Sequence, residues 1–215
     1  MTTPSGPRAP RWLIPVAVAM AVLLVAAGGA LAVITGIGRT DAPAEASVDV
    51  GFARDMSTHH AQAVTMAGIA RDQSNDVDVR TLAFDIETGQ NQQIGVMLGW
   101  LQVWDRPVNG TAEPMAWMAG HDMPTMNGNM MAGMATSDEL NRLRAASGDE
   151  LDVLFLQLMT RHHHGGVEMA RYAVEHASTS PVRTLARSMA NGQAAEIATM
   201  QGMLADRGGS TLPYP

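Results

Sequence analysis

Apolar side chains recur every third or fourth position in two long stretches of the chain, which is the period of one face of an α-helix. The first stretch begins at Phe52 and continues through Met56, Ala63 and Met66, with His59 on the same face. The same spacing returns from Phe155 onward. Alternation typical of strands is weak, and aromatic residues make up only 4% of the sequence. The pattern therefore predicts an all-α protein.

The two stretches belong to an internal duplication. Residues 49–102 align without a gap with residues 152–205, and about 21 of the 54 aligned positions are identical. Each copy reads as two helices joined by a few residues, near Ser74–Asp76 in the first copy and Ser178–Thr179 in the second. Such a pair forms an antiparallel hairpin. One hairpin cannot bury its apolar face alone, whereas two related hairpins can close a four-helix bundle.

The duplication also sets the expected organisation of the chain. We predict a bundle over residues 47–208, divided into a first hairpin (47–104), a methionine-rich connection (105–148) and a second hairpin (149–208), followed by a tail (209–215). Capping signals mark three helix starts in this region: Ser147 with Glu150, Thr136 with Glu139, and Ser180 followed by Pro181.

An apolar run of about 23 residues precedes the repeats, from Trp12 to Ile34. As a helix it would rise about 35 Å, enough to cross the roughly 30 Å hydrocarbon core of a bilayer. Two arginines shortly before it favour a cytoplasmic amino terminus. We therefore predict a cytoplasmic segment (1–11), a transmembrane anchor (12–34) and a linker (35–46), with a cleaved signal segment as the alternative. With an anchor or with a cleaved signal, the rest of the chain would lie outside the cytoplasm. With an anchor, the protein would also stay attached to the membrane.

The composition limits which partners the protein can bind and which interactions can stabilise its fold. The sequence has 215 residues, no cysteine and a formal net charge of −7. Without cysteine, an exported domain cannot use disulfides and depends on its apolar core. No basic stripe is present to displace counterions from phosphates, so we expect no nucleic-acid partner.

Two adjacent histidines recur at matching positions of the two copies, as His59-His60 and His162-His163. At 100° per residue, His162 lies on the inward face of its helix and His163 at the edge of that face. A third histidine, His164, falls on the opposite side, toward solvent. The facing helix of each hairpin brings polar side chains to the same depth, and these possible partners are Gln90, Gln93, Gln193 and Glu196.

The paired imidazoles have two readings, a hydrogen-bonded polar layer within the bundle or a set of metal ligands. Buried imidazoles need partners, and a core built only for stability could use leucine instead. Methionines accompany the histidines on the same face, where they serve either as gap-filling core or as soft ligands. These methionines are Met56, Met66, Met159 and Met169.

The connection between the copies is rich in methionine, interleaved with glycine, asparagine and proline. Thioethers are soft ligands suited to Cu(I), and imidazole suits both Cu(I) and Cu(II). Thioethers also stay competent in an oxidising compartment, where thiolates would form disulfides. The candidate ligands in this connection are Met115, Met118, Met123 and Met126 with His121. A loop that contacts a partner protein through its apolar side chains is the alternative reading.

Other chemistries have less support in the sequence. A structural zinc site would draw on thiolates or several carboxylates. A di-iron bundle would need Glu-x-x-His motifs, which neither copy of the histidine motif contains. We find no nucleophile beside a base, no glycine-rich phosphate loop and no other cofactor motif. We therefore predict no catalytic residues, and copper as the bound ion.

These motifs resemble those of a bacterial family, domain of unknown function 305. The second copy is the stronger match, with "LDVLFLQLMTRHHHGGVEMARYA", "VRTLARSM" and "GQAAEIATM", and the first contributes "VDVGFARDMSTHHAQAVTMA". The resemblance covers nearly everything after residue 46. It implies a ferritin-like four-helix bundle, exported or membrane-anchored. Some relatives are described as periplasmic copper-binding proteins that use methionine and histidine.

Carried over to this chain, the resemblance implies a role for the same two histidine pairs and for the methionines beside them. The chain departs from the family at Gly165-Gly166, where a small pair containing alanine is common. Two glycines inside a helix cost about 1 kcal/mol each relative to alanine. They also let a neighbouring helix or a ligand approach closely.

We therefore expect an extracytoplasmic metal-binding protein that serves in copper buffering, tolerance or delivery. It would bind copper through its histidine pairs and methionine-rich connection. A membrane-tethered interaction module with a structural histidine layer is the second hypothesis, and a ferritin-like redox enzyme is the third. A second copy of the chain or a copper-handling protein is the expected protein partner.

Overall fold

The computed structural model describes residues 20, 24, 41–118 and 131–214, which belong to two compact units. The first unit ends at Asp41, and its described residues Met20 and Leu24 are helical and exposed. The rest of the predicted membrane segment, like residues 1–11, lies outside the described residues. Within the described part, no helix combines the length and the apolar character needed to span a bilayer.

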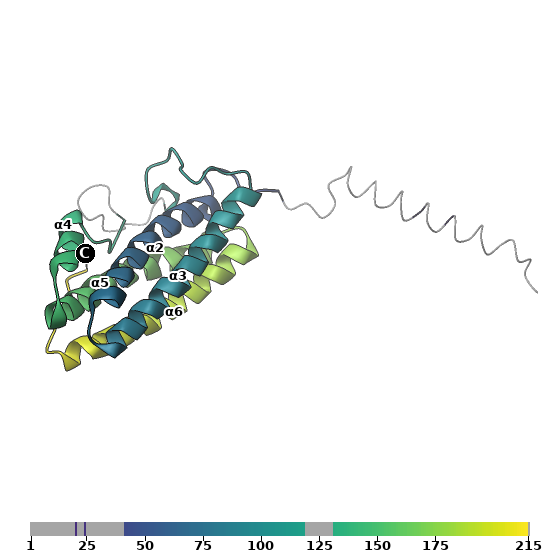
Figure 1. The fold of residues 1–215 in the computed structure, drawn as a ribbon. Helices are drawn as coiled ribbons and strands as arrows, with labels where there is room; N and C mark the ends of the chain where they lie inside the picture. Colours follow the sequence, from purple (N-terminus) through teal and green to yellow (C-terminus); the bar gives the residue numbers. More distant parts are fainter. Residues whose placement is uncertain (1–19, 21–23, 25–40, 119–130, 215) are drawn as a thin grey trace, which may run out of the picture. The chain divides into compact units, whose positions relative to one another are not determined.

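The second unit, from Ala42 onward, is built from helices, and its described residues contain no strand. In the described part of this unit, four long helices and two short ones follow one another: α2 (Val48–Gln73), α3 (Val77–Val103), η1 (Ala116–Met118), α4 (Ser137–Ala145), α5 (Gly148–His176) and α6 (Ser180–Asp206) (Figure 1). The prediction of an all-α protein is confirmed.

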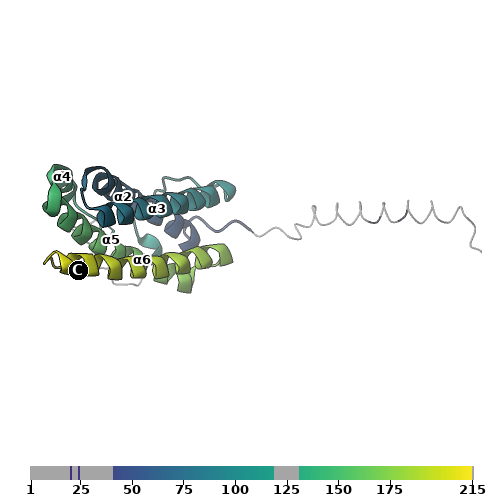
Figure 2. The same ribbon diagram turned by 60° about the horizontal axis from the view of Figure 1, so that its bottom comes forward.

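The four long helices pack as two hairpins. Helix α2 lies along α3, α5 lies along α6, and the two pairs meet through α2 and α5 (Figures 1 and 2). Asp49, at the start of α2, accepts hydrogen bonds from the backbone N–H groups and hydroxyls of Ser178 and Thr179, just after α5. Helices α2 and α5 are therefore antiparallel. The predicted helical bundle is confirmed, with the α3 and α6 backbones approaching each other less closely.

The helix starts agree only in part with the capping signals in the sequence. Thr136 and Glu139 form the predicted capping box of α4. The box predicted at Ser147 is wrong, because the chain turns at Gly148, with φ of 56°, and the Ser147 side chain makes no capping bond. Helix α6 begins one residue earlier than predicted, with Thr179 as N-cap. The Thr179 hydroxyl donates to Asp49 instead of capping its own helix.

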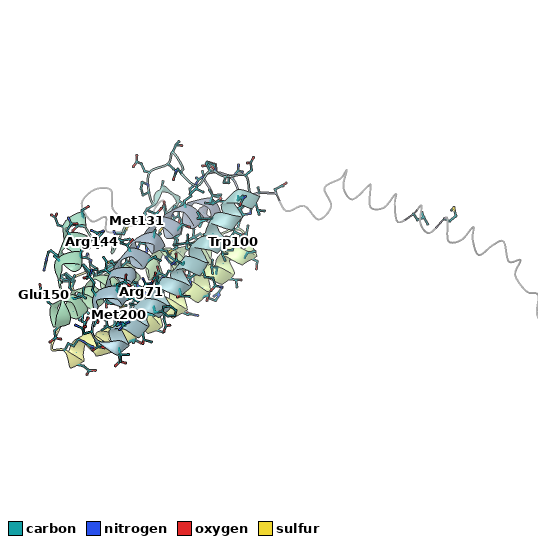
Figure 3. All side chains as sticks on the ribbon, in the orientation of Figure 1. Arg71, Trp100, Met131, Arg144, Glu150 and Met200 are labelled. Atoms are coloured by element: carbon teal, nitrogen blue, oxygen red, sulfur yellow. The ribbon has the colours of Figure 1, made fainter. Side chains whose placement is uncertain are left out.

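The core of the bundle is divided into two apolar clusters, one on each side of the histidines. The first cluster contains Met66 and Met159, and the second contains Met56 and Met169. Each histidine pair follows a methionine of one cluster and precedes a methionine of the other along its helix. Side chains fill the space between the helices, with Glu150 near one end of the bundle and Trp100 near the other (Figure 3). The histidines thus interrupt an otherwise apolar core.

Residues 131–135 of the connection pack across α2 and α5. Gln62 of α2 exchanges two hydrogen bonds with the backbone of Ala135, at 2.6 and 2.9 Å. On α5, a Cβ added at Gly165 would overlap the carbonyl oxygen of Ala132. The close approach expected at this glycine is therefore made by the chain's own connection.

We predict that Gly165→Ala lowers the free energy of unfolding by about 1–3 kcal/mol, because overpacking against a backbone carbonyl outweighs the gain in helix propensity. Gly68→Ala is the matched control, since a Cβ there meets nothing within 4 Å. It should raise the unfolding free energy by about 1 kcal/mol. Urea denaturation of both variants measures the difference. Equal stabilisation by the two changes would contradict the packing described here.

Candidate metal centre

The four repeated histidines form one layer in the centre of the bundle. The side chains of His59, His60, His162 and His163 are all 0% exposed. The rings of His59 and His162 come from α2 and α5 and face each other, with centroids 3.7 Å apart and planes inclined by 32°. The rings of His60 and His163 lie 6.5 and 6.3 Å from those of their neighbours in sequence. The two pairs therefore meet where the hairpins cross.

Hydrogen bonds determine which ring nitrogen carries the proton. The Nε2 atom of His60 lies 2.7 Å from Oε1 of Gln93, and that of His163 lies 2.7 Å from a carboxylate oxygen of Glu196. The Nε2 atom of His59 lies 3.3 Å from the carbonyl oxygen of Ala132. Because these oxygens accept, the three rings donate from Nε2. In a neutral ring, Nδ1 then keeps a free lone pair.

Five ring nitrogens of the layer have no hydrogen-bond partner. They are Nδ1 of His59, His60 and His163 and both ring nitrogens of His162. Buried polar atoms are almost always paired, because each unpaired one costs about 1–3 kcal/mol. A cluster of unpaired lone pairs inside a core indicates a site for a species that accepts electron pairs.

Burial keeps the inward rings uncharged. It lowers the pKa of His59 to about 3 and that of His60 to about 4, and the neighbouring imidazoles act in the same direction. The pKa of His162 is also lowered well below its usual value, first by burial and then by the charges that His59 and His163 would carry. A metal competes with protons for imidazole nitrogen, so these rings are ready to bind a cation at neutral pH.

Buried sulfur lies on both sides of the histidine layer. The four methionines predicted beside the histidines are 0% exposed. Sulfur is more abundant in the cluster that contains Met56 and Met169, since Met118 and Met131 are buried there and Met115 is packed against it. The remaining predicted ligands, His121, Met123 and Met126, lie outside the described residues.

A carboxylate that the sequence did not single out holds the start of the connection. Asp55 of α2 accepts a hydrogen bond from the Met115 N–H and another from the Trp117 indole, each 2.7 Å long. Burial raises the pKa of Asp55. Trp117 then packs edge-to-face against Phe52, with centroids 5.9 Å apart. Helix α2 therefore anchors the methionine-rich connection near the histidine layer.

The outward histidine differs from the prediction. His164 is half-buried instead of facing solvent, because the tail returns along α5 and places the Tyr214 ring 5.6 Å from it. The Tyr214 hydroxyl donates to Glu168, also on α5. His164 remains outside the layer formed by the four repeated histidines.

The donor set suits a soft ion better than a hard one. Within the described ranges, no three His, Cys, Asp or Glu side chains are arranged as a metal-binding group. The unpaired imidazole nitrogens are the available donors. Thioethers belong to the apolar clusters on both sides of the layer. Imidazole with thioether is a donor set for copper in either oxidation state.

We predict that the metal-free protein loses stability as the pH falls from 6.5 toward 4. The unfolded chain binds protons on these rings near pH 6.5, whereas the folded state binds them only near pH 4 for His60 and pH 3 for His59. The unfolding free energy should fall by up to about 1.4 kcal/mol per pH unit for each ring. Denaturant titrations at several pH values measure the slope. His59→Gln/His60→Gln should flatten it, while a slope unchanged by that double variant would contradict the assignment.

Comparisons with known proteins find solved structures that are similar to this chain. A Streptomyces coelicolor protein, described as a candidate secreted member of domain of unknown function 305, is 44% identical, with a TM-score of 0.73 over 80% of this chain and 100% of its own. A fragment of another member, from Deinococcus radiodurans, is 31% identical, with a TM-score of 0.62 over 74% and 96%. A comparison with curated proteins found no significant match.

A third relative carries a metal in its solved structures. CopM in its Cu(I)-bound form is 25% identical, with a TM-score of 0.58 over 74% of this chain and 96% of its own. Its Cu(II)-bound form aligns at 28% identity with a TM-score of 0.59. The model of domain of unknown function 305 (DUF305) matches residues 49–204. The chain described here belongs to the DUF305 family.

Proposed function

We propose that this protein is an extracytoplasmic copper-binding protein that serves in copper buffering, copper tolerance or copper delivery. The observation that carries the proposal is the layer of four buried histidines, in which five ring nitrogens have no partner. Neutral imidazoles with free Nδ1 lone pairs are ligands in their binding form. The histidines that would hold the ion are His59, His60, His162 and His163.

The ligand chemistry favours copper over other metals. Thioethers bind Cu(I) and are poor ligands for Mg²⁺, Ca²⁺ or Mn²⁺, which prefer oxygen. Structural zinc sites rely on thiolates, and the sequence has no cysteine. Buried Met56, Met66, Met159 and Met169, with Met115 and Met118 of the connection, would supply soft donors on either side of the layer. His121, Met123 and Met126 would extend this set.

The family supports the same assignment. CopM, which has been crystallised with Cu(I) and with Cu(II), aligns with this chain over most of its own length. The Streptomyces relative is described as a candidate secreted protein. These descriptions support an extracytoplasmic copper site, presented on a ferritin-like bundle whose two hairpins are joined by one long connection. We place the bundle outside the cytoplasm, behind an anchor or signal at residues 12–34.

A purely structural histidine layer is the rival explanation, and the glutamines argue against it. In such a layer, the ring nitrogens and the polar side chains at the same depth would all have hydrogen-bond partners. Gln93 and Glu196 do pair with His60 and His163. Gln90 and Gln193, at the same depth, leave all four of their amide atoms without partners. The layer is therefore incomplete as a hydrogen-bonded network, which favours a ligand-binding role.

Replacing the four layer histidines by alanine in the full chain should abolish tight copper binding. We expect the Cu(I) affinity to fall by more than about 100-fold, because loss of the groups that merely orient ligands already costs 10–100-fold. Competition with a chromophoric Cu(I) chelator measures the affinity, and circular dichroism checks the fold. The matched control is His164→Ala/His176→Ala, which removes two imidazoles outside the layer. Copper stoichiometry and affinity unaltered in the fourfold variant would refute the proposal.

The carboxylate of Glu196 should bias the second half of the layer toward Cu(II). It accepts a hydrogen bond from His163 and places a carboxylate beside that ring, whereas Gln93 offers His60 a neutral acceptor. We expect Glu196→Gln to weaken Cu(II) binding by about 10-fold or more and Cu(I) binding less. Gln93→Glu should strengthen Cu(II) binding, and strengthen Cu(I) binding less. Equal losses for both ions in Glu196→Gln would contradict this role.

A further inference from the structure

A narrow cleft between α3 and α6 borders the histidine layer. Its volume is about 50 Å³. The cleft repeats the internal duplication, since its lining residues Gly89, Gln90 and Gln93 of α3 match Gly192, Gln193 and Glu196 of α6. The outer helices approach each other less closely than the inner ones, which leaves this opening.

The lining of the cleft contacts the imidazoles directly. Gln93 and Glu196 line it, and each forms a hydrogen bond with a layer histidine. On the other side of the layer, the segment 131–135 covers the helices, and its Ala132 carbonyl accepts from His59. On the side of the cleft, therefore, polar side chains contact the rings instead of the backbone of the connection.

Two buried amides point to a ligand in this cleft. Gln90 and Gln193 are only 4% and 5% exposed, yet neither the oxygen nor the nitrogen of either amide has a partner. Unpaired buried amides are costly and are normally satisfied by protein, water or an ion. Amide oxygens ligate cations, and amide N–H groups donate to the water or anion that accompanies them. A volume near 50 Å³ accommodates one partly hydrated ion.

The charge at the mouth favours a cation. The Glu196 side chain is 33% exposed, and its carboxylate also bonds to the buried His163, so this residue connects solvent with the layer. A carboxylate in a narrow opening raises the local concentration of positive ions. The corresponding Gln93 is neutral, so an ion entering the cleft meets a single negative charge beside a set of amide oxygens.

We propose that this cleft is the entry site for the cation, where the amides of Gln90 and Gln193 bind it before transfer to His60 and His163. This inference rests on the copper-binding function proposed above. The amide site is distinct from the histidine layer. It replaces part of the water around the ion, and the imidazoles of His60 and His163 then take the ion into the core. The same cleft is the route of release.

Two glycines allow the cleft to be closed without disturbing the fold. A Cβ at Gly89 or Gly192 would meet nothing within 4 Å, although both residues line the cleft. Gly89→Leu/Gly192→Leu should therefore fold normally and place two apolar side chains across the opening. Gly202→Leu is the matched control, because Gly202 lies on α6, also has free space and is not a residue of the cleft.

In the full chain, Gly89→Leu/Gly192→Leu should slow both Cu(I) uptake and Cu(I) extraction by excess chelator by about tenfold or more. The equilibrium stoichiometry and affinity should stay at wild-type values, because the histidines are unchanged. Gly202→Leu should exchange copper at the wild-type rate. Gln90→Leu/Gln193→Leu, which removes the amides, should also slow uptake. Stopped-flow mixing with the chromophoric chelator gives these rates.

A metal-free readout separates this inference from the copper proposal. Exchange of the imidazole C2 proton in D₂O, followed by mass spectrometry, reports the access of solvent to each ring. It should slow at His60 and His163 in Gly89→Leu/Gly192→Leu and remain unchanged in Gly202→Leu. If Gly89→Leu/Gly192→Leu takes up and releases copper at wild-type rates and its imidazole C2 protons also exchange at wild-type rates, the entry route is overturned. The copper site itself would remain supported. If the layer binds no copper, the copper proposal fails, and unchanged exchange would still overturn the route.

Discussion

The structure depends on the contact between two imidazole rings, His59 and His162, where α2 and α5 cross. Burial at this crossing removes the water that would otherwise satisfy the ring nitrogens and favours the neutral form of each ring. The apolar clusters on either side keep the layer dry, and the hydrogen bonds from Nε2 orient three of the rings. A soft cation is the species that such a set of free lone pairs inside a dry core would stabilise most.

The two copies of the repeat have diverged in a way that serves this layer. Gln62 of the first copy corresponds to Gly165 of the second. Gln62 holds the connection by hydrogen bonds to Ala135, whereas Gly165 leaves space for the carbonyl of Ala132. One side of the layer is thereby covered by the chain's own connection. The equivalent pair Gln93 and Glu196 differs by one charge, which makes the two halves chemically unequal.

Features that depend on helical period could be predicted from the sequence. The spacing of apolar residues predicted the helices, and the 100° rotation per residue placed His59 and His162 inside the bundle. The hairpin register also brought Gln93 and Glu196 level with their histidines. His163, expected at the edge of the inward face, is fully buried, because α6 covers that edge with Glu196.

Features that depend on contacts between distant segments could not be predicted in this way. The bonds from Ser178 and Thr179 to Asp49 arise only once α2 and α5 lie antiparallel, so local capping rules misplaced the start of α6. The Ala132 carbonyl acts as a partner of His59 because of the path of the connection. The tail similarly covers His164 through Tyr214. None of these contacts has a periodic signal.

The ¹⁵N chemical shifts of the histidine rings, recorded by NMR with and without one equivalent of Cu(I), test the central claim most directly. Without metal at pH 7, His59 and His60 should be neutral and protonated on Nε2. On adding Cu(I), Nδ1 resonances of the layer should shift, while those of His164 and His176 stay in place. Rings protonated on both nitrogens, or layer resonances that Cu(I) leaves unmoved, would contradict the account.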